Sequence, residues 1–231
     1  HVDGSVDPLR DIETINLELI MSDLETVKKR LDKAEKYMKA GDKRAFEEAA
    51  LCKKLDAHLN AGHCARTLSL SDEERELVRD FFLLTIKPVI YCANISESGI
   101  GAQNPYVEQV RKFAAQENSE TIEICAKVEE EISQLPKEER PMFLEELGLR
   151  ESGLERIIKA GYTLLGLISY LTAGEKEVRA WTIEQGTKAP QAAGKIHSDF
   201  ERGFIRAEIV SYDDLIAAGG FNQAKERGKV R

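Results

Sequence analysis

The sequence predicts an α/β fold that carries a helical hairpin and ends in a small α+β unit. Three observations predict it. Apolar residues recur at heptad spacing near the N-terminus, and two short apolar segments alternate with helical segments between residues 87 and 135. Beyond Ala173-Gly174 the pattern changes to alternating apolar and polar residues, which is typical of a half-exposed strand.

The composition is that of a folded protein. Its 231 residues are enough for one or two domains, and 42% hydrophobic residues with 32% charged ones exclude the disordered class. No apolar run approaches the roughly 20 residues of a membrane helix, and the N-terminus has no basic-then-apolar signal segment. The four cysteines are too few and too scattered for a disulfide scaffold. We therefore expect a cytoplasmic protein with no membrane contact.

The N-terminal third predicts an antiparallel helical hairpin. Residues 8–20 read as a helix with Pro8 near its first turn, and the heptad seam then runs from Leu24 to Met38. Gly41-Asp42 breaks the pattern before a second helix with leucines four apart. At about 1.5 Å per residue the arms would reach on the order of 25 Å. The alternative is two separate helices packed on a globular body.

The middle of the chain predicts a doubly wound sheet. Ser71 with Glu74 three residues later marks a helix start. Residues 87–94 read as a strand buried on both faces, and a helix follows from Asn104-Pro105. A second short strand at 121–125 and a helix at 127–135 complete the order strand, loop, helix, strand, loop, helix. This order is typical of a parallel sheet covered by helices.

The C-terminal part predicts a separate unit. Residues 137–168 read as helical with a break near 148–153. After a boundary near 169–174, the pattern predicts in turn a strand at 177–183, a helix at 189–199, a strand at 204–210 and a short helix at 213–218. The expected domains are therefore 1–21 with 85–168, the hairpin 22–84, and 169–231.

Charge is spread unevenly along the chain. Residues 175–231 carry 10 basic and 9 acidic side chains, whereas the first 174 carry 23 and 32. This split makes the C-terminal part the better candidate for contact with a polyanion.

A polar tetrapeptide follows the first predicted strand directly. It runs from Asn94 to Glu97 with the pattern N-x-x-E. In a doubly wound sheet, ligands bind beyond the carboxyl ends of the strands. An amide there can donate and accept, and a carboxylate can accept from the N–H groups of a base. Alone, this pattern is weak evidence, because polar loops are common at such positions.

A second loop follows the next predicted strand about 30 residues later. GTPase-type folds place a small-residue loop similar to S-A-K there, whose backbone N–H groups contact the base. The two loops together predict a nucleotide base-binding site, formed by Asn94, Ile95, Glu97, Cys125, Ala126 and Lys127.

The C-terminal part resembles the TGS domain of the YchF-type Obg-like ATPases, a family of P-loop NTPases. The resemblance rests on RAWTI at 179–183, GTKAPQAAGKIHSDF at 186–200 and GFIRAE at 203–208. The opening residues 1–8, the N-x-x-E loop and residues 158–162 fall in the family's order, so the resemblance covers essentially the whole chain. It implies the C-terminal part of a P-loop GTPase-like sheet with a coiled-coil hairpin insertion, followed by a ubiquitin-like TGS domain that is incomplete at its C-terminus.

The resemblance implies roles for particular residues. Asn94 and Glu97 hold the positions of the guanine-reading N-K-x-D loop of GTPases, and Ile95 replaces the lysine that would cover the base. Adenine offers an N6 donor and an N1 acceptor, so we expect ATP to bind better than GTP, with Ile95 contacting the base. His1 aligns with a histidine implicated in positioning the attacking water.

The phosphate-binding part of the family's site is absent from the sequence. There is no G-x-x-x-x-G-K-[ST] motif, and no aspartate has glycine three residues later. Phosphate and Mg²⁺ positioning are the larger part of phosphoryl-transfer catalysis. We therefore expect a parent ATPase that uses ATP and Mg²⁺, and a chain that holds no metal and hydrolyses no ATP on its own.

Two functions compete. The first is a ribosome-associated ATPase with a translation-related role, acting as a monomer on the large ribosomal subunit. The second is a non-catalytic RNA- or ribosome-binding module made by the hairpin and the TGS-like unit. For RNA contact the candidates are Lys188, Lys195, Arg202 and Arg206, interleaved with aromatic residues. The alternative is that these four side chains are solvated and paired with neighbouring acids.

Overall fold

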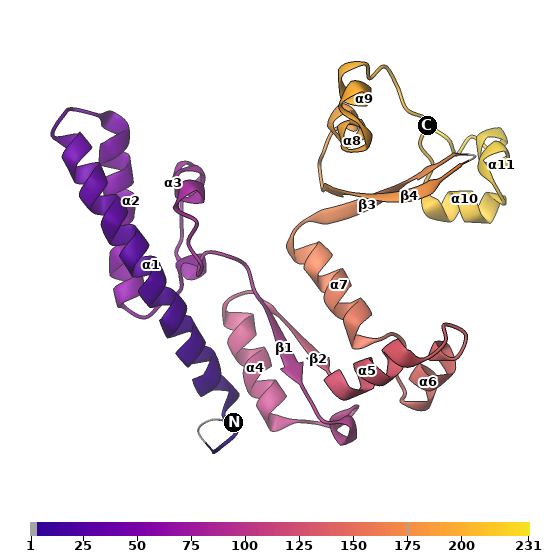
Figure 1. The fold of residues 1–231 in the computed structure, drawn as a ribbon, viewed down its shortest axis with the longest axis horizontal. Coiled ribbons are helices and arrows are strands. Elements are labelled where there is room, and N and C mark those ends of the chain that lie inside the picture. The colour runs from indigo at the N-terminus through magenta and orange to yellow at the C-terminus, as the bar shows by residue number, and fades with distance from the viewer. Residues whose placement is uncertain (1–3, 175) are drawn as a thin grey trace. The chain divides into compact units, whose positions relative to one another are not determined.

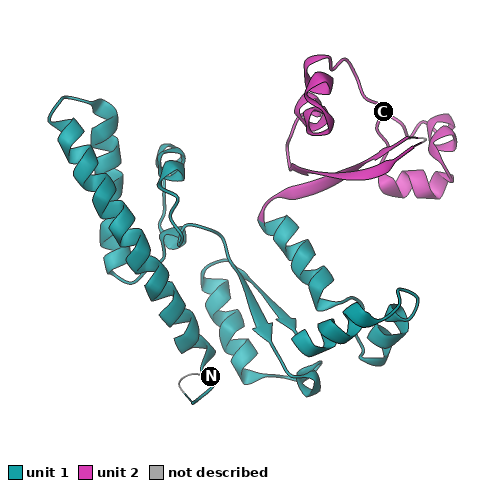
Figure 2. Ribbon diagram, viewed as in Figure 1, with its two compact units in different colours: residues 1–164 teal, residues 165–231 magenta. Residues whose placement is uncertain are grey.

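The computed structural model describes residues 4–174 and 176–231. The chain forms two compact units, the first ending at Leu164 and the second spanning Leu165–Arg231 (Figure 2). Of the helices in the described part of the chain, none combines the length and the apolar character needed to cross a bilayer.

A long helical hairpin begins the first unit (Figure 1). Helix α1 (Pro8–Met38) is capped by the Asp7 side chain, and helix α2 (Lys43–Asn60) by Asp42. The expected helix at 8–20 and the first arm of the hairpin are one continuous helix, because neither glycine nor proline interrupts the chain between them. The expected boundary at residues 21 and 22 therefore falls inside α1.

The hairpin shares its core with the segment that follows it. Leu51, Leu55 and Leu59 of α2 pack against Val27 of α1, and each is at most 1% exposed. The short helices η1 (Ala65–Thr67), α3 (Asp72–Val78) and η2 (Arg79–Phe81) cover the same core. Ser71 and Glu74 form the predicted capping box at the start of α3.

A parallel β-α-β unit lies beside the hairpin. Strand β1 (Ile90–Asn94) pairs in parallel with β2 (Glu120–Ile124), and helix α4 (Pro105–Gln116) connects them. Helix α5 (Ala126–Gln134) follows β2, so the predicted order of elements is confirmed. The expectation that β1 is buried on both faces is wrong: Cys92 and Asn94 are exposed, because the sheet has only two strands among the described residues.

Helices α6 (Arg140–Glu146) and α7 (Gly153–Leu164) complete the first unit. The predicted break between them is confirmed. A Cβ atom on Gly153 would lie 2.7 Å from Cγ2 of Ile124, so glycine permits the close approach of α7 to β2. Helix α7 ends at Leu164 rather than at 168, because the chain next enters a strand.

The second unit is built on an antiparallel pair. Strand β3 (Leu167–Ala173) pairs with β4 (Val178–Glu184). Only β4 was expected from the sequence. Four helices follow: α8 (Ala189–Ile196), α9 (Ser198–Arg202), α10 (Tyr212–Ala218) and α11 (Phe221–Glu226).

Two predictions for this unit are wrong. The expected helix at 189–199 is split at His197, whose φ and ψ of −162° and 144° are extended. The expected strand at 204–210 is not formed. Ile209 exchanges backbone hydrogen bonds with Arg231 at 2.9 Å, and Phe204 donates to the Glu201 carbonyl at 3.4 Å, but among the described residues no strand pairs along this segment.

Candidate functional site

The two predicted loops meet at the carboxyl ends of β1 and β2. The Ile95 amide donates to the Ile124 carbonyl at 2.8 Å, which extends the strand pairing by one bond. The side-chain oxygen Oδ1 of Asn94 then accepts the Ala126 amide at 3.1 Å. Asn94 therefore connects the end of β1 to the first residue of α5, and its bond fixes the distance between the loops.

An ion pair spans the same two loops. Nζ of Lys127 lies 3.0 Å from Oε2 of Glu97, which is in the short helix η3 (Glu97–Gly99). The hydrogen bond that Lys127 donates to the Glu97 carboxylate raises the pKa of Lys127 above its usual value. Both side chains are exposed, so the pair adds little stability. The pair matters for ligand binding, because one carboxylate oxygen of Glu97 already accepts a hydrogen bond from a cation.

The loops line an open pocket of about 670 Å³. All six residues predicted for base binding line it, and the structure adds Ser96, Ser98 and Leu147. Ile95 is half-buried and packs against the apolar cluster of Cys125, Val128 and Ile132, so one side of it is core and the other lines the pocket. No local signal marks Leu147, because it reaches the pocket from the end of α6.

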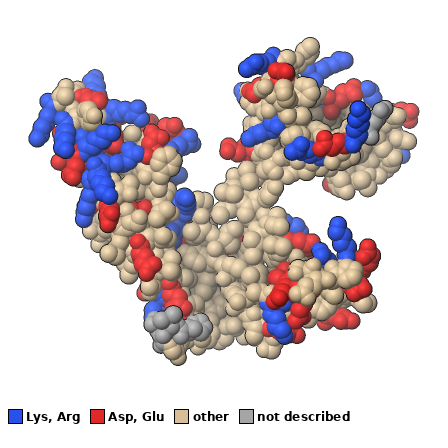
Figure 3. Space-filling view, viewed as in Figure 1, with Lys and Arg blue, Asp and Glu red and all other residues tan. Residues whose placement is uncertain are grey.

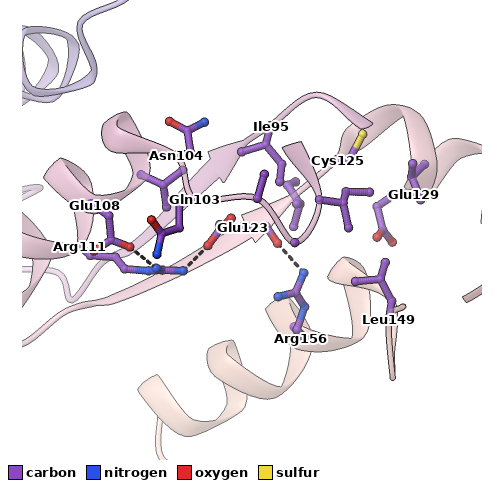
Figure 4. A pocket seen from close by; sticks show the side chains of 16 residues that line it. Ile95, Gln103, Asn104, Glu108, Arg111, Glu123, Cys125, Glu129, Leu149 and Arg156 are labelled. Atoms are coloured by element: carbon purple, nitrogen blue, oxygen red, sulfur yellow. Dashed lines mark hydrogen bonds and ion pairs between the residues drawn. The ribbon is translucent and has the colours of Figure 1, made fainter. Parts of the chain in front are cut away.

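A second pocket lies between α4, β2 and α7, and shares Ile95 and Cys125 with the first (Figure 4). Several of its charged side chains bond to one another or to backbone groups. Arg111 bonds both Glu108 and Glu123, and Arg156 donates to the Glu123 carbonyl. Glu129 accepts the amides of Gly153 and Leu154 at the start of α7. These bonds connect α4 and α7 to β2, and α5 to α7.

The described residues contain no metal cluster. In residues 4–174 and 176–231, no group of three or more His, Cys, Asp or Glu side chains is arranged to hold an ion. His1, the candidate for positioning water, lies outside the described residues.

The four basic residues predicted for RNA contact are all exposed in the second unit. Lys188 occupies the N-cap position of α8, Lys195 lies in the last turn of that helix, and Arg202 ends α9. Two neighbouring acids that could neutralise these residues have other partners: Glu208 pairs with Lys225, and Asp199 lies 3.5 Å from Nδ1 of His197.

Within the described ranges, none of Lys188, Lys195, Arg202 and Arg206 lies within 4.0 Å of a carboxylate. Trp181, an aromatic candidate for stacking, is instead covered by the Arg179 guanidinium at 4.3 Å and donates to Thr172.

Comparison with known proteins gives a consistent result. Residues 167–231 match the family YchF-GTPase_C, which is described as a protein of unknown function (DUF933). The chain is 54% identical to the "Ribosome-binding ATPase YchF" of Bacillus subtilis (strain 168) and 50% identical to that of Escherichia coli O157:H7. These matches span 100% of this chain, but 64% and 63% of the two relatives.

A plant protein and a solved structure extend the similarity. The "Obg-like ATPase 1" of Oryza sativa subsp. indica is 40% identical over 100% of this chain and 59% of its own length. The structure of the Schizosaccharomyces pombe YchF GTPase has a TM-score of 0.86 at 38% identity, covering 99% of this chain and 63% of that one. The α/β arrangement of this chain is thus that of the YchF structure. From end to end, the chain is a homologue of the YchF proteins.

Proposed function

We propose that this chain forms the base-reading and ribosome-contacting part of an ATP-hydrolysing protein of the Obg-like class. The observation that carries the proposal is the convergence of both predicted loops on one pocket. In open α/β sheets, ligands bind at the carboxyl ends of the strands, which is where this pocket lies. The names of the relatives, ribosome-binding ATPase and Obg-like ATPase, support the same activity.

The pocket favours adenine over guanine for two reasons. Reading guanine requires a carboxylate that accepts from two N–H groups at once. Glu97 already gives one oxygen to Lys127 at 3.0 Å, so guanine would compete with the ammonium group. Ile95 and Leu147 offer apolar surface to the face of a base, and that contact does not depend on the pattern of N–H groups. Asn94 keeps the loops at the separation that this contact needs.

Hydrolysis requires groups that this sequence does not supply. A phosphate-binding segment and Mg²⁺ would act elsewhere in a longer protein, and Mg²⁺ bound there would neutralise the developing charge on the phosphates. The residues of this chain bind and orient the base. We further propose a cytoplasmic monomer whose second unit is TGS-like and which acts on the large ribosomal subunit during translation.

Titration of ATP and GTP against the full-length protein tests the nucleotide proposal. We expect ATP to bind more tightly. Lys127→Ala frees Glu97 to accept hydrogen bonds from guanine and should narrow the difference between the affinities for ATP and GTP. Lys137→Ala, at an exposed position outside the pocket, should leave this difference unchanged. A tenfold preference of the unaltered protein for GTP, about 1.4 kcal/mol, contradicts the proposal.

The second candidate function is a binding module without catalysis. It is favoured by the exposed Lys188, Lys195, Arg202 and Arg206, which have no carboxylate within 4.0 Å in the described part of the chain. Reversing Lys188 and Arg202 to glutamate should weaken cosedimentation with ribosomes and leave ATP affinity unchanged. Equal cosedimentation at every salt concentration would place the contact on another surface.

A further inference from the structure

The tip of the hairpin, residues 28–44, is strongly basic in an acidic protein. It carries eight basic and three acidic side chains, whereas the whole chain has a net charge of −8. The rest of the hairpin, residues 8–27 and 45–60, carries three basic and eight acidic side chains. Figure 3 shows the basic side chains gathered at the tip. Charges that served solubility alone would be interleaved, so this segregation along one element calls for a different explanation.

Most lysines of the tip have no acidic partner. Arg30 is engaged with Glu48 and with the Phe81 ring, and Lys53 pairs with Glu35 from outside the tip. In the described ranges no carboxylate lies within 4.0 Å of five exposed lysines, which are Lys28, Lys33, Lys36, Lys39 and Lys43. These five positive charges are therefore exposed to solvent and, among the described residues, not neutralised by a nearby carboxylate.

Helix stability does not account for all of these charges. Cations are favourable near the C-terminus of a helix, which suits Lys36 in the last turn of α1. At the N-terminus of a helix they are unfavourable, yet α2 begins with Lys43 and Arg44 and has no acid in its first turn. The tip thus keeps two cations where they oppose the dipole of α2.

One row of α1 combines cations with an aromatic side chain. Lys29, Lys33, Lys36 and Tyr37 follow one another at helical spacings of four, three and one, so they lie along one side of the helix. Asp32, three residues after Lys29 and four before Lys36, is an acid on the same side, but cations outnumber it there, and Tyr37 is 53% exposed. Lys29 has only an exposed pair with Glu25 at 3.7 Å, which contributes little. Cations that contact phosphates beside an aromatic ring that stacks on a base are the usual means of binding single-stranded nucleic acid.

We propose that this row on the hairpin tip binds single-stranded RNA through its phosphates, with Tyr37 stacking on a base. The proposal deepens the proposed function by naming the surface and the chemistry of its ribosome contact, and it rests on that contact rather than on the nucleotide pocket. The net negative charge of the first 174 residues conceals the positive charge of residues 28–44. The tip has a net charge of +5, against +1 for residues 175–231.

Fluorescence anisotropy with a labelled 20-nucleotide RNA of mixed sequence, from 50 to 300 mM KCl, tests the proposal on the whole chain. The tip variant is Lys29→Glu with Lys33→Glu and Lys36→Glu. Its control reverses the exposed Lys112, Lys137 and Lys176, so both variants undergo the same change in net charge. Loss of three phosphate contacts should make the slope of log affinity against log salt shallower by about 2. The control should retain the slope of the unaltered chain.

Tyr37→Leu separates stacking from charge. It should weaken RNA binding by about fivefold or more at every salt concentration without changing the slope. Circular dichroism must show unchanged helix content in every variant. If the triple charge reversal unfolds the tip, Tyr37→Leu still tests the proposal, because it leaves the charge of the tip unchanged.

Three results would overturn the inference: no binding of RNA at 50 mM KCl, equal losses in the tip variant and its control, or poly-L-glutamate competing as well as RNA. The last would identify an acidic polypeptide as the partner. If only the Lys188 and Arg202 variant loses RNA, the inference fails while the proposed ribosome contact of the second unit stands.

Discussion

Asp23 is the buried carboxylate that ties the hairpin to the segment leading into β1, and its removal should destabilise the first unit. The side chain of Asp23 is 2% exposed. One of its oxygens accepts the Leu84 amide at 2.7 Å, and the other accepts the amide and the hydroxyl of Thr85 at 2.8 and 2.7 Å. Thr85 is itself fully buried, so water cannot replace these bonds.

The magnitude follows from the donors that Asp23→Ala would leave without an acceptor. An unsatisfied buried donor costs about 1–3 kcal/mol. Three donors are affected, but the Leu84 amide is only partly buried, and removing the carboxylate also removes the cost of burying its charge. We therefore expect the free energy of unfolding to fall by about 3 kcal/mol.

Urea unfolding followed by circular dichroism at 222 nm measures this change. Asp32→Ala is the matched control, because it makes the same substitution in α1 at an exposed residue, where the effect should stay within about 0.5 kcal/mol. Comparison of the two variants cancels the gain in helix propensity that both receive. A difference below about 1 kcal/mol would show that the carboxylate is not the link that its geometry indicates.

Two further predictions concern the rest of the first unit. Gly153→Ala should lower the free energy of unfolding by about 1–3 kcal/mol, because the added Cβ would lie 2.7 Å from Cγ2 of Ile124. Gly161→Ala in the same helix meets nothing within 4 Å and should stabilise it; similar urea midpoints for both would refute the packing argument. Burial and the hydrogen bond to Glu117 raise the pKa of Tyr91 to about 12 from an ordinary value of 10. Because the pKa of Tyr91 is higher in the folded state, this contribution to stability is present below pH 10 and is lost as the pH rises toward 12. Between pH 9 and pH 11, the free energy of unfolding should therefore fall less in Tyr91→Phe than in the unaltered chain.

Several features of the fold could be predicted from local sequence. The capping box of Ser71, the proline that opens α4 and the glycine-containing break of the hairpin each depend on residues within one turn of chain. These signals act over three or four residues, so no tertiary contact is needed to interpret them. Convergence of the Asn94 and Ala126 loops was predictable for a related reason, because parallel strands present their carboxyl ends at the same edge of a sheet.

Other features depended on partners far along the chain. Leu147 lines the pocket between the two loops because α6 returns to α5, and nothing near Leu147 in the sequence indicates that contact. Strand β3 forms because β4 pairs with it, whereas the equally strand-like segment at 204–210 stays irregular without such a neighbour. The sequence by itself determined where α3 and α4 start, because short-range bonds decide this, and which loops meet, because parallel strands end at one edge of a sheet. The tertiary structure alone decided that β3 pairs with β4 and that Leu147 completes the pocket, because those contacts form between segments whose meeting no local pattern specifies.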